Sequence, residues 1–400
     1  MLSTQPDDDP AAAALANADG EIHAGRYREA IRLLEALHAR DPDQPRANYL
    51  HGVALAMLGD RSAAHWRFGR AAQLAPSDSA LQCYAAAACI EQGQRADAAR
   101  YCRAALAADP QCRPAYDLLA SAELPGEHYL KLLGRIHAHL RPRTYVEIGI
   151  FAGASFRLAQ PPTLAIGIDP DPQLDAPPSP SHWIFRQTSD AFFAEHDLAE
   201  ALGGRAVELA LIDGMHQFEF VLRDFLNLER HCAPDATILV HDCFPLDEIS
   251  AARERTTAFW SGDVWRALLA LKKWRPDLAL HTVGAPPTGL GVIRNLDPAS
   301  RVLAENLDRI CAEFRAVAYE TIGGRSPRRS TSSPTIGATC RRSSTPRRAR
   351  SADSVRTSRD TIRRRSGSSG PSRIPPARCR GMRRRRRTPP RRLAARPESS

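Results

Sequence analysis

The sequence lacks the marks of three protein classes. No apolar run reaches the roughly 18 residues that suggest a membrane-spanning helix, so no membrane span is expected. The segment Met1 to Pro10 carries three aspartates in place of a basic region and an apolar stretch, so a secretory signal is not expected either. Nine cysteines are scattered without a Cys-x-x-Cys pair. This argues against a zinc ribbon or a disulfide framework and predicts a cytoplasmic protein.

Lysine is absent from the last part of the chain. Residues 325–400 contain 24 arginines and three acidic residues, whereas residues 1–324 contain 31 basic and 42 acidic residues. The net charge of +10 therefore comes from the tail, and nucleic acid is not an expected partner apart from this basic segment. No aromatic residue lies among these arginines, so base stacking is not indicated.

Residues 323–400 are predicted to form a disordered tail, because arginine, serine and proline dominate and few aliphatic side chains could be buried. One interpretation is a functional arm for nucleic acid or an anionic surface. The other is out-of-frame translation of a GC-rich gene. We favour the second hypothesis because the composition changes abruptly and the arginines occur without lysine.

A 34-residue period runs through residues 11–122. Proline, glycine, alanine and one larger residue each recur at this interval: Pro42, Pro76 and Pro110; Gly25, Gly59 and Gly93; Ala30, Ala64 and Ala98; Leu34, Phe68 and Cys102. Small residues allow close helix crossing, and proline ends the second helix of each unit. The period resembles the tetratricopeptide repeat, although an ordinary alanine-rich bundle is an alternative. The resemblance implies an all-α solenoid with a groove for a protein or peptide partner; self-association and stability are its alternative roles.

Short apolar segments alternate with helices after a linker helix at 123–143, which predicts a mostly parallel α/β domain over 144–322. The expected strands are Tyr145–Ile148, Leu164–Ile168, Trp183–Arg186, Leu209–Ile212, Thr237–Val240, Leu280–Val283 and Gly289–Arg294. The last two strands should be antiparallel neighbours, because the loop between them is too short for a helical crossover.

A glycine turn follows the first of these strands. Gly149 and Gly153 allow the backbone to approach a ligand, and Ser155 marks an expected helix start whose N–H groups are free. The spacing differs from the Gly-x-Gly-x-x-Gly dinucleotide pattern. A purely structural turn is therefore an equal alternative.

Carboxylates lie at or just after the ends of the first five strands: Glu147, Asp169, Asp190, Asp213 and Asp242. Ligands bind beyond the carboxyl ends of strands in an open parallel sheet, so these acids are predicted to share one rim. Any single one of them could instead cap a helix, Asp190 above all, but five in register are hard to explain in that way.

Residues 126–300 resemble a class I S-adenosylmethionine-dependent methyltransferase, in the group related to macrolide and sugar O-methyltransferases and cephalosporin-hydroxylase-like proteins. The glycine turn, Gly167–Pro170, Ile212–Glu219 and Gly289–Ile293 carry the resemblance. It implies a Rossmann-like, seven-stranded sheet with an antiparallel last strand.

The resemblance also implies roles in a bound S-adenosylmethionine site. Gly149 and Gly153 would face the amino-acid end of the cofactor, and Glu147 would brace the turn beside Ser155. Asp169 would accept hydrogen bonds from both ribose hydroxyls. Ser189 and Asp190 would lie near the adenine.

A hydroxyl acceptor must lose its proton, and His216 with Asp213 is the candidate catalytic pair. The alternative is that His216 only holds its own loop. Asp213 and Asp242, with His241 nearby, are candidate ligands for a divalent cation such as Mg²⁺. Metal-dependent relatives usually carry two adjacent acids where this chain has His241-Asp242, which argues against the cation.

The helix after His216 should bury Val221, Phe225 and Leu228 and leave its polar residues Arg223, Asp224, Asn227 and Glu229 mostly in solvent. Trp260, Trp265 and Trp274 are expected in the core, with an acceptor pocket as the alternative.

The sequence therefore predicts a cytoplasmic S-adenosylmethionine-dependent methyltransferase that acts on an oxygen of a sugar or other small molecule and carries a repeat module for a partner. A non-catalytic scaffold with a relic cofactor domain is the alternative. A nicotinamide-dependent oxidoreductase is disfavoured by the glycine spacing and the terminal strand pair.

Overall fold

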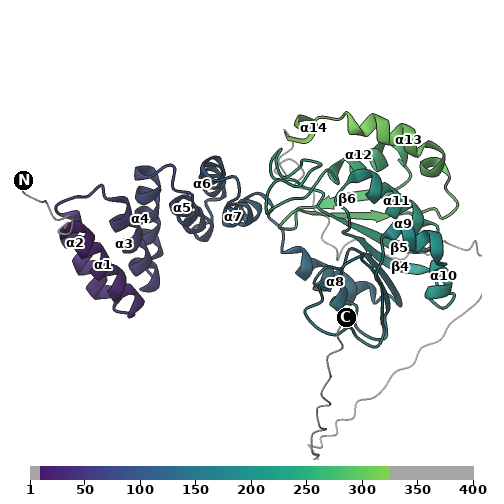
Figure 1. Ribbon diagram of the computed structural model, residues 1–400, viewed down its shortest axis with the longest axis horizontal. Coiled ribbons are helices and arrows are strands. Elements are labelled where there is room, and N and C mark those ends of the chain that lie inside the picture. The colour runs from purple at the N-terminus through teal and green to yellow at the C-terminus, as the bar shows by residue number, and fades with distance from the viewer. Residues whose placement is uncertain (1–9, 324–400) are drawn as a thin grey trace, which may run out of the picture. The chain divides into compact units, whose positions relative to one another are not determined.

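The computed structural model describes residues 10–323, which form a series of helical repeats followed by a seven-stranded α/β fold. The predicted tail lies outside the described residues, apart from Gly323 at the end of the last helix. Figure 1 shows the helices and strands as a ribbon, with the labels used below and a colour that follows the residue number.

The repeats consist of helices that pack on their neighbours in sequence order, each on the next. Their bounds are α1 (Pro10–His23), α2 (Tyr27–His38), α3 (Pro45–Met57), α4 (Arg61–Leu74), α5 (Ser79–Glu91), α6 (Arg95–Ala108) and α7 (Arg113–Glu123). Aspartates begin two of them: Asp60 caps α4 through the amide of Ala63, and Asp78 caps α5. This arrangement is the predicted tetratricopeptide-like solenoid.

The 34-residue period has a direct structural cause. Gly25, Gly59 and Gly93 end the first helix of each pair with φ between 73° and 87°. A Cβ at any of them would meet nothing within 4 Å, so glycine is favoured there by backbone conformation and not by space. The alanines of the period are buried, as are the larger residues Leu34, Phe68 and Cys102. The same positions of each 34-residue unit are therefore buried.

The α/β fold contains seven strands in the order β3-β2-β1-β4-β5-β7-β6. They are β1 (Thr144–Ile148), β2 (Leu164–Ile168), β3 (His182–Phe185), β4 (Val207–Ile212), β5 (Cys232–His241), β6 (Ala279–Val283) and β7 (Leu290–Arg294). Within this sheet β7 runs antiparallel to both of its neighbours, β5 and β6, whereas β1 to β5 pair in parallel. The prediction of an antiparallel last strand beside β6 is confirmed.

Helices cover both faces of the sheet (Figure 1). One face packs against α8 (Tyr129–Leu140) and the short 3₁₀ helix η1 (Phe156–Leu158). The other face packs against α9 (Ser189–Glu195), α11 (Phe218–Glu229), α12 (Trp265–Trp274) and α13 (Val302–Arg315). Two short helices, α10 (Leu198–Ala201) and α14 (Glu320–Gly323), complete the fold. Tyr145 and Val146 lie in the two different cores because alternate strand residues point to opposite faces.

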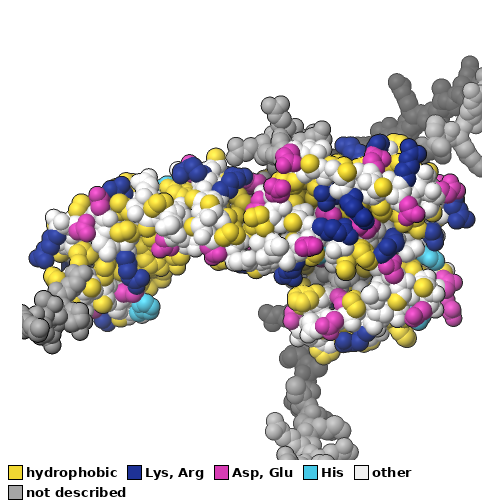
Figure 2. Space-filling view, turned by 45° about the horizontal axis from the view of Figure 1, so that its top comes forward, with side chains coloured by type: hydrophobic (Ala, Val, Ile, Leu, Met, Phe, Trp, Pro, Cys, Tyr) yellow, Lys and Arg dark blue, Asp and Glu magenta, His cyan; other side chains and the backbone are white. Residues whose placement is uncertain are grey.

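Basic and acidic side chains are interspersed over the face seen in Figure 2. A surface that binds nucleic acid would instead show a continuous patch of Lys and Arg side chains. Among the described residues, no helix combines the length and the apolar character that crossing a bilayer requires.

Candidate functional site

The turn after β1 requires glycine at two positions. Gly149 and Gly153 have φ of 84° and 77°. A Cβ on Gly149 would lie 2.1 Å from the carbonyl oxygen of Asp213, so any side chain would push the turn away from the end of β4. A helix does start at Ser155, as expected, but it is only the three-residue 3₁₀ helix η1. The prolines at 161 and 162 explain this, since the residue before a proline disfavours helical angles.

Glu147 links the end of β1 to the beginning of η1. Its side chain is fully buried and accepts hydrogen bonds from the hydroxyls of Tyr145, at 2.7 Å, and Ser155. Burial raises the pKa of Glu147 to about 8, against the opposing effect of these two hydrogen bonds. The carboxyl group therefore holds its proton at neutral pH and braces the turn as a neutral acid.

Asp169 follows β2 and holds the glycine turn from the other side. One carboxylate oxygen accepts the backbone N–H groups of Ile150 and Phe151, both at 2.9 Å. The other oxygen accepts the N–H of Asp171 at 2.8 Å. The structure thus gives Asp169 backbone partners, and the predicted contact with ribose hydroxyls stays a prediction.

The residues after β3 meet the helix α11. Ser189 begins α9, and the exposed Asp190 pairs with Arg223 at 2.6 Å. Asp224 is buried, so its predicted exposure to solvent is wrong.

Glu229 is buried as well, where it accepts two hydrogen bonds from the guanidinium of Arg275. The expectation that it lies in solvent is also wrong. Both errors have one cause: α11 is covered by α9, α12 and α13 and has no free side comparable to that of a surface helix.

Asp224 yields a prediction for the pH dependence of stability. Burial raises its pKa to about 7, so the folded state holds a proton that the unfolded state releases near pH 4. Its contribution to stability is complete below pH 4 and is lost as the pH rises toward 7. We expect Asp224→Asn to increase the free energy of unfolding at pH 8 relative to wild type, with the difference shrinking toward pH 5. Urea unfolding at both pH values measures this, and an equal difference at both contradicts it.

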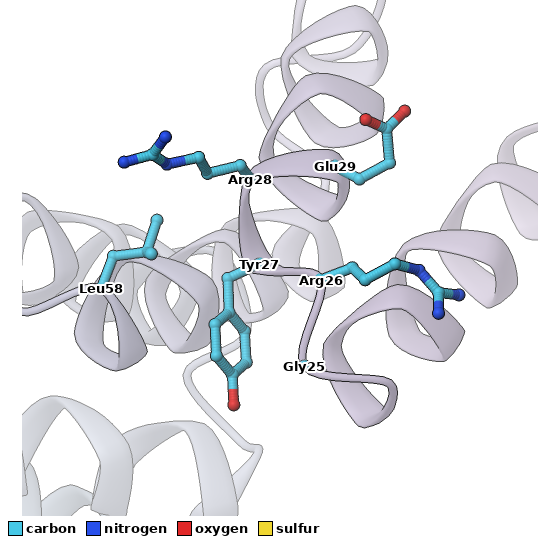
Figure 3. Close-up of a pocket in the computed structure, with 6 residues that line it drawn as sticks. All are labelled: Gly25, Arg26, Tyr27, Arg28, Glu29 and Leu58. Carbon is cyan, nitrogen blue, oxygen red and sulfur yellow. The ribbon is translucent and has the colours of Figure 1, made fainter.

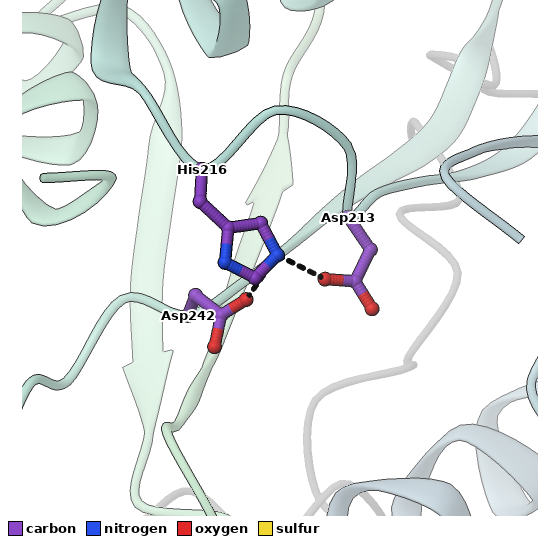
Figure 4. A group of neighbouring side chains, drawn as sticks. All are labelled: Asp213, His216 and Asp242. Atoms are coloured by element: carbon purple, nitrogen blue, oxygen red, sulfur yellow. Dashed lines mark ion pairs between the residues drawn. The ribbon is translucent and has the colours of Figure 1, made fainter. Parts of the chain in front are cut away.

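The ends of β4 and β5 bring the carboxylates of Asp213 and Asp242 together with the imidazole of His216 (Figure 4), and the imidazole of His241 lies beside them. The His216 Nε2 atom lies 3.0 Å from Asp242 Oδ2 and 3.5 Å from Asp213 Oδ1. The His241 Nδ1 atom lies 3.1 Å from Asp213 Oδ1 and 3.3 Å from Asp242 Oδ2. His216 and Asp242 both have positive φ, at 57° and 61°, which turns their side chains toward each other.

The charges of this cluster are coupled. Burial alone would lower the pKa of His216, but the carboxylates of Asp242 and Asp213 outweigh it and raise that pKa to about 9. The same two carboxylates raise the pKa of His241. The histidines in turn lower the pKa of Asp213, although burial acts in the opposite direction. At neutral pH the cluster therefore holds two imidazolium groups against its carboxylates.

Further side chains enclose the cluster. Trp260 stacks on His216 with ring centres 5.1 Å apart, so it lines the site and not the core. Trp265 is buried in the core, as expected, and Trp274 packs partly buried against that core. Sequence reasoning missed Tyr129, whose ring lies 4.1 Å from that of His241. Its position on α8 carries no local signal for this contact.

Two surface hollows lie outside this cluster. One, of about 370 Å³, is lined by Gly25–Glu29 and Leu58 at the turn between α1 and α2 (Figure 3). The other, of about 480 Å³, lies between the segment after β5 and the residues around Tyr319. Neither is lined by the predicted cofactor residues.

Residues 146–243 match the family described as a methyltransferase domain. No curated protein matches the chain. Among solved structures, MamA from Desulfovibrio magneticus RS-1 is 27% identical, with a TM-score of 0.27, over 31% of this chain and 70% of that one. The chaperone SycD from Yersinia enterocolitica, in complex with a peptide of the translocator YopD, is 16% identical, with a TM-score of 0.28, over 30% and 98%.

The match covers the first five strands, from β1 to the end of β5, and includes the glycine turn, Asp169, Asp213, His216 and Asp242. The chain therefore combines a methyltransferase domain with a tetratricopeptide-like helical module.

Proposed function

We propose that the chain is an S-adenosylmethionine-dependent O-methyltransferase for a sugar or other small metabolite, and that its repeats bind a protein or peptide partner. The observation that carries the proposal is the cluster of Asp213, His216 and Asp242 beside the glycine turn. The proposed division of the chain is that of the sequence, with repeats over 11–122, a linker over 123–143 and the catalytic domain over 144–322.

S-adenosylmethionine supplies a methyl group on a positively charged sulfonium when it is bound. The glycine turn, whose residues Ile150 and Ser155 are held by Asp169 and Glu147, would be the surface against which the cofactor lies. The carboxylate of Asp169, whose partners among the described residues are backbone N–H groups, would favour a positive ligand at this edge. Orientation matters because in-line transfer between aligned reactants removes up to about 7–11 kcal/mol of the barrier.

Two buried polar atoms near the end of β3 support a nucleoside in this place. Gln187 Nε2, a donor, and Asp224 Oδ1 have no hydrogen-bond partner within the described part of the chain. Asp224 also interacts with Ser189, one of the residues predicted to lie near the adenine. Buried polar atoms are rarely left unpaired, so these two atoms fit a ligand with polar groups of its own.

His216 is the proposed general base, with Asp213 and Asp242 as its partners. Its raised pKa keeps it protonated at neutral pH in this state. A divalent cation such as Mg²⁺ or Mn²⁺ at the two carboxylates would polarise the acceptor hydroxyl and offset the charges that raise this pKa. The three side chains offer ligand atoms within 4.8 Å of one another. One imidazole nitrogen and two carboxylate oxygens suit Mn²⁺ at least as well as Mg²⁺. With a cation bound in this way His216 would be a ligand, and the cation would activate the hydroxyl in place of the general base.

The groove of the repeats offers an aromatic surface on α3 and α5. Tyr49 and Tyr84 have ring centres 4.7 Å apart, and Tyr84 is exposed. A peptide with apolar anchors fits such a surface, and SycD is a chaperone solved with a peptide.

Ligand binding separates this proposal from the alternatives. S-adenosylmethionine and S-adenosylhomocysteine should each raise the melting temperature of the full chain, whereas NAD should leave it unchanged. Stabilisation by NAD alone would instead favour an oxidoreductase. Stabilisation by S-adenosylmethionine without methyl transfer to any sugar or small-molecule hydroxyl would favour the non-catalytic scaffold.

Asp169→Ala should abolish binding of S-adenosylmethionine, because the turn loses the carboxylate that holds the amides of Ile150 and Phe151. Titration calorimetry measures the affinity. Asp171→Ala is the matched control, because it removes an exposed carboxyl two residues away and keeps the backbone N–H that Asp169 accepts. Unchanged affinity in Asp169→Ala contradicts the assignment.

A further inference from the structure

The turn that carries His216 is not held by its own sequence. His216 has a φ of 57°, a conformation that is strained for an L-residue other than glycine. The helix α11 begins two residues later, and its N-cap residue Gln217 makes no side-chain capping hydrogen bond. A strained turn and an uncapped helix start therefore need support from elsewhere.

Asp263 supplies this support from a segment 45 positions further along the chain. Its Oδ1 atom accepts the N–H of Phe218, the first residue of α11, at 2.8 Å. Its own N–H donates to the carbonyl oxygen of His216 at 3.1 Å. The side chain is fully buried, and its negative charge lies at the positive end of the helix. One residue thus fixes both ends of the His216–Phe218 turn.

Two arginines hold Asp263 in turn. Arg266 donates to its Oδ2 atom at 2.8 Å, and Arg253 lies 3.4 Å from the same atom. Arg253 also donates to the side chains of Gln217 at 2.9 Å and Glu219 at 2.6 Å. The buried charge of Asp263 is therefore paired. The guanidinium of Arg253 also binds the side chains on either side of Phe218 in the sequence, Gln217 and Glu219.

The segment 250–263, which we call the brace, also confines the imidazole itself. Trp260 stacks on His216 at an interplanar angle of 22° and donates its indole N–H to the carbonyl oxygen of Ala252. A Cβ on Gly262 would lie 1.9 Å from the carbonyl oxygen of His216, so the two backbones are in direct contact. The amides of Ser261 and Gly262 both donate to the carbonyl oxygen of Ser250, which closes the brace on itself.

We propose that Asp263 is a positioning residue, and that through the brace it holds the His216 imidazole against Asp242 in the orientation that proton transfer or cation binding requires. This inference rests on the proposed function for the role of His216. It assigns to a residue outside the family-matched segment 146–243 a part in the site that this segment forms.

The experiment compares Asp263→Ala, Asp263→Asn and wild type in the full chain. Asn keeps an oxygen acceptor for the Phe218 amide, so it should rescue most of the effect if the hydrogen bond positions the turn. Asp197→Ala is the matched control, because Asp197 caps α10 with the same type of bond to Ala199 but is not among the residues of the cluster. Melting temperature, Mn²⁺ affinity and S-adenosylmethionine affinity are measured for each variant. The rate of His216 modification by diethyl pyrocarbonate is followed by mass spectrometry.

We expect Asp263→Ala to weaken Mn²⁺ binding about 10- to 100-fold, the usual range for partners that orient a metal ligand. It should also raise the modification rate of His216 severalfold, with S-adenosylmethionine affinity kept within about threefold. Asp263→Asn and Asp197→Ala should stay near wild type in both readouts. Measurements at a fixed interval below each melting temperature separate positioning from loss of stability.

A lowered melting temperature with unchanged His216 reactivity and Mn²⁺ affinity would overturn the inference and leave Asp263 as a helix cap. If Asp263→Ala does not fold, Trp260→Leu tests the same brace through the ring that covers His216. If wild type binds neither Mn²⁺ nor S-adenosylmethionine, the proposed function fails. The His216 modification rate then still decides whether the brace holds the imidazole.

Discussion

Gly149→Ala should weaken S-adenosylmethionine binding about 10- to 100-fold, because forcing an extra methyl group into a closely packed turn costs roughly 1–3 kcal/mol. The new methyl group would lie 2.1 Å from the carbonyl oxygen of Asp213, and the residue would keep a φ of 84° only under strain. The turn must therefore move away from β4, carrying the backbone amides that Asp169 holds. Titration calorimetry with the full chain measures the loss.

Gly203→Ala is the matched control for this substitution. Gly203 also has a positive φ, at 62°, but a Cβ there would meet nothing within 4 Å. The two variants share the cost of an L-residue in the left-handed region, roughly 1–2 kcal/mol, and differ only in the collision. Similar cofactor affinities in the two variants would show that the contact between the turn and β4 does not shape the site.

Asp242→Asn should lower the free energy of unfolding by about 3 kcal/mol at pH 7, because it removes one partner of a buried charge pair. His216 then keeps only the more distant carboxylate of Asp213, at 3.5 Å instead of 3.0 Å, and its pKa falls. Asn tolerates the positive φ of this position, so the change isolates the charge. Mn²⁺ binding should be lost, while S-adenosylmethionine affinity changes less than about threefold. Urea unfolding and calorimetry measure these effects.

Asp235→Asn is the matched control. It removes an exposed carboxyl from the same strand and should change neither stability nor Mn²⁺ affinity.

The stability of wild type should depend on pH through His216. Wild type should lose part of the contribution that His216 makes to the free energy of unfolding as the pH rises. The pKa of this histidine is raised in the folded state, so its contribution is complete below pH 6.5 and is lost toward pH 9. Unfolding free energies of Asp242→Asn that parallel wild type from pH 6 to 9 would contradict the assigned ion pair.

The order of elements was predictable because it depends on local spacing. The 34-residue period places a glycine with positive φ at the end of each first helix, and that requirement is visible in the sequence without any partner. The strand positions of the sheet agree with the apolar segments, although β4 and β5 begin two and five residues earlier than predicted. The carboxylates at the strand ends were found for the same reason, since parallel strands bring their carboxyl ends to one edge.

The contacts of those residues were not predictable from spacing. A helix was expected after Ser155 because a glycine turn usually precedes one, but two prolines limit it to η1. Asp224 was expected in solvent because its helix has one apolar face, yet neighbouring helices cover the polar face too. An amphipathic pattern shows which side of a helix packs on the sheet, whereas contacts with neighbouring helices on the same face of the sheet leave no comparable signal.

Short-range periodicity and backbone preference are enough to predict the repeat, the positions of the strands along the chain and the residue types at the carboxyl edge of the sheet. Tertiary structure alone decided that Asp169 holds backbone amides, that Trp260 covers His216 and that Asp263 supports the turn. These contacts join residues that lie at least 18 positions apart in the sequence, and 45 positions apart for Phe218 and Asp263. Their geometry therefore depends on how whole helices and strands pack.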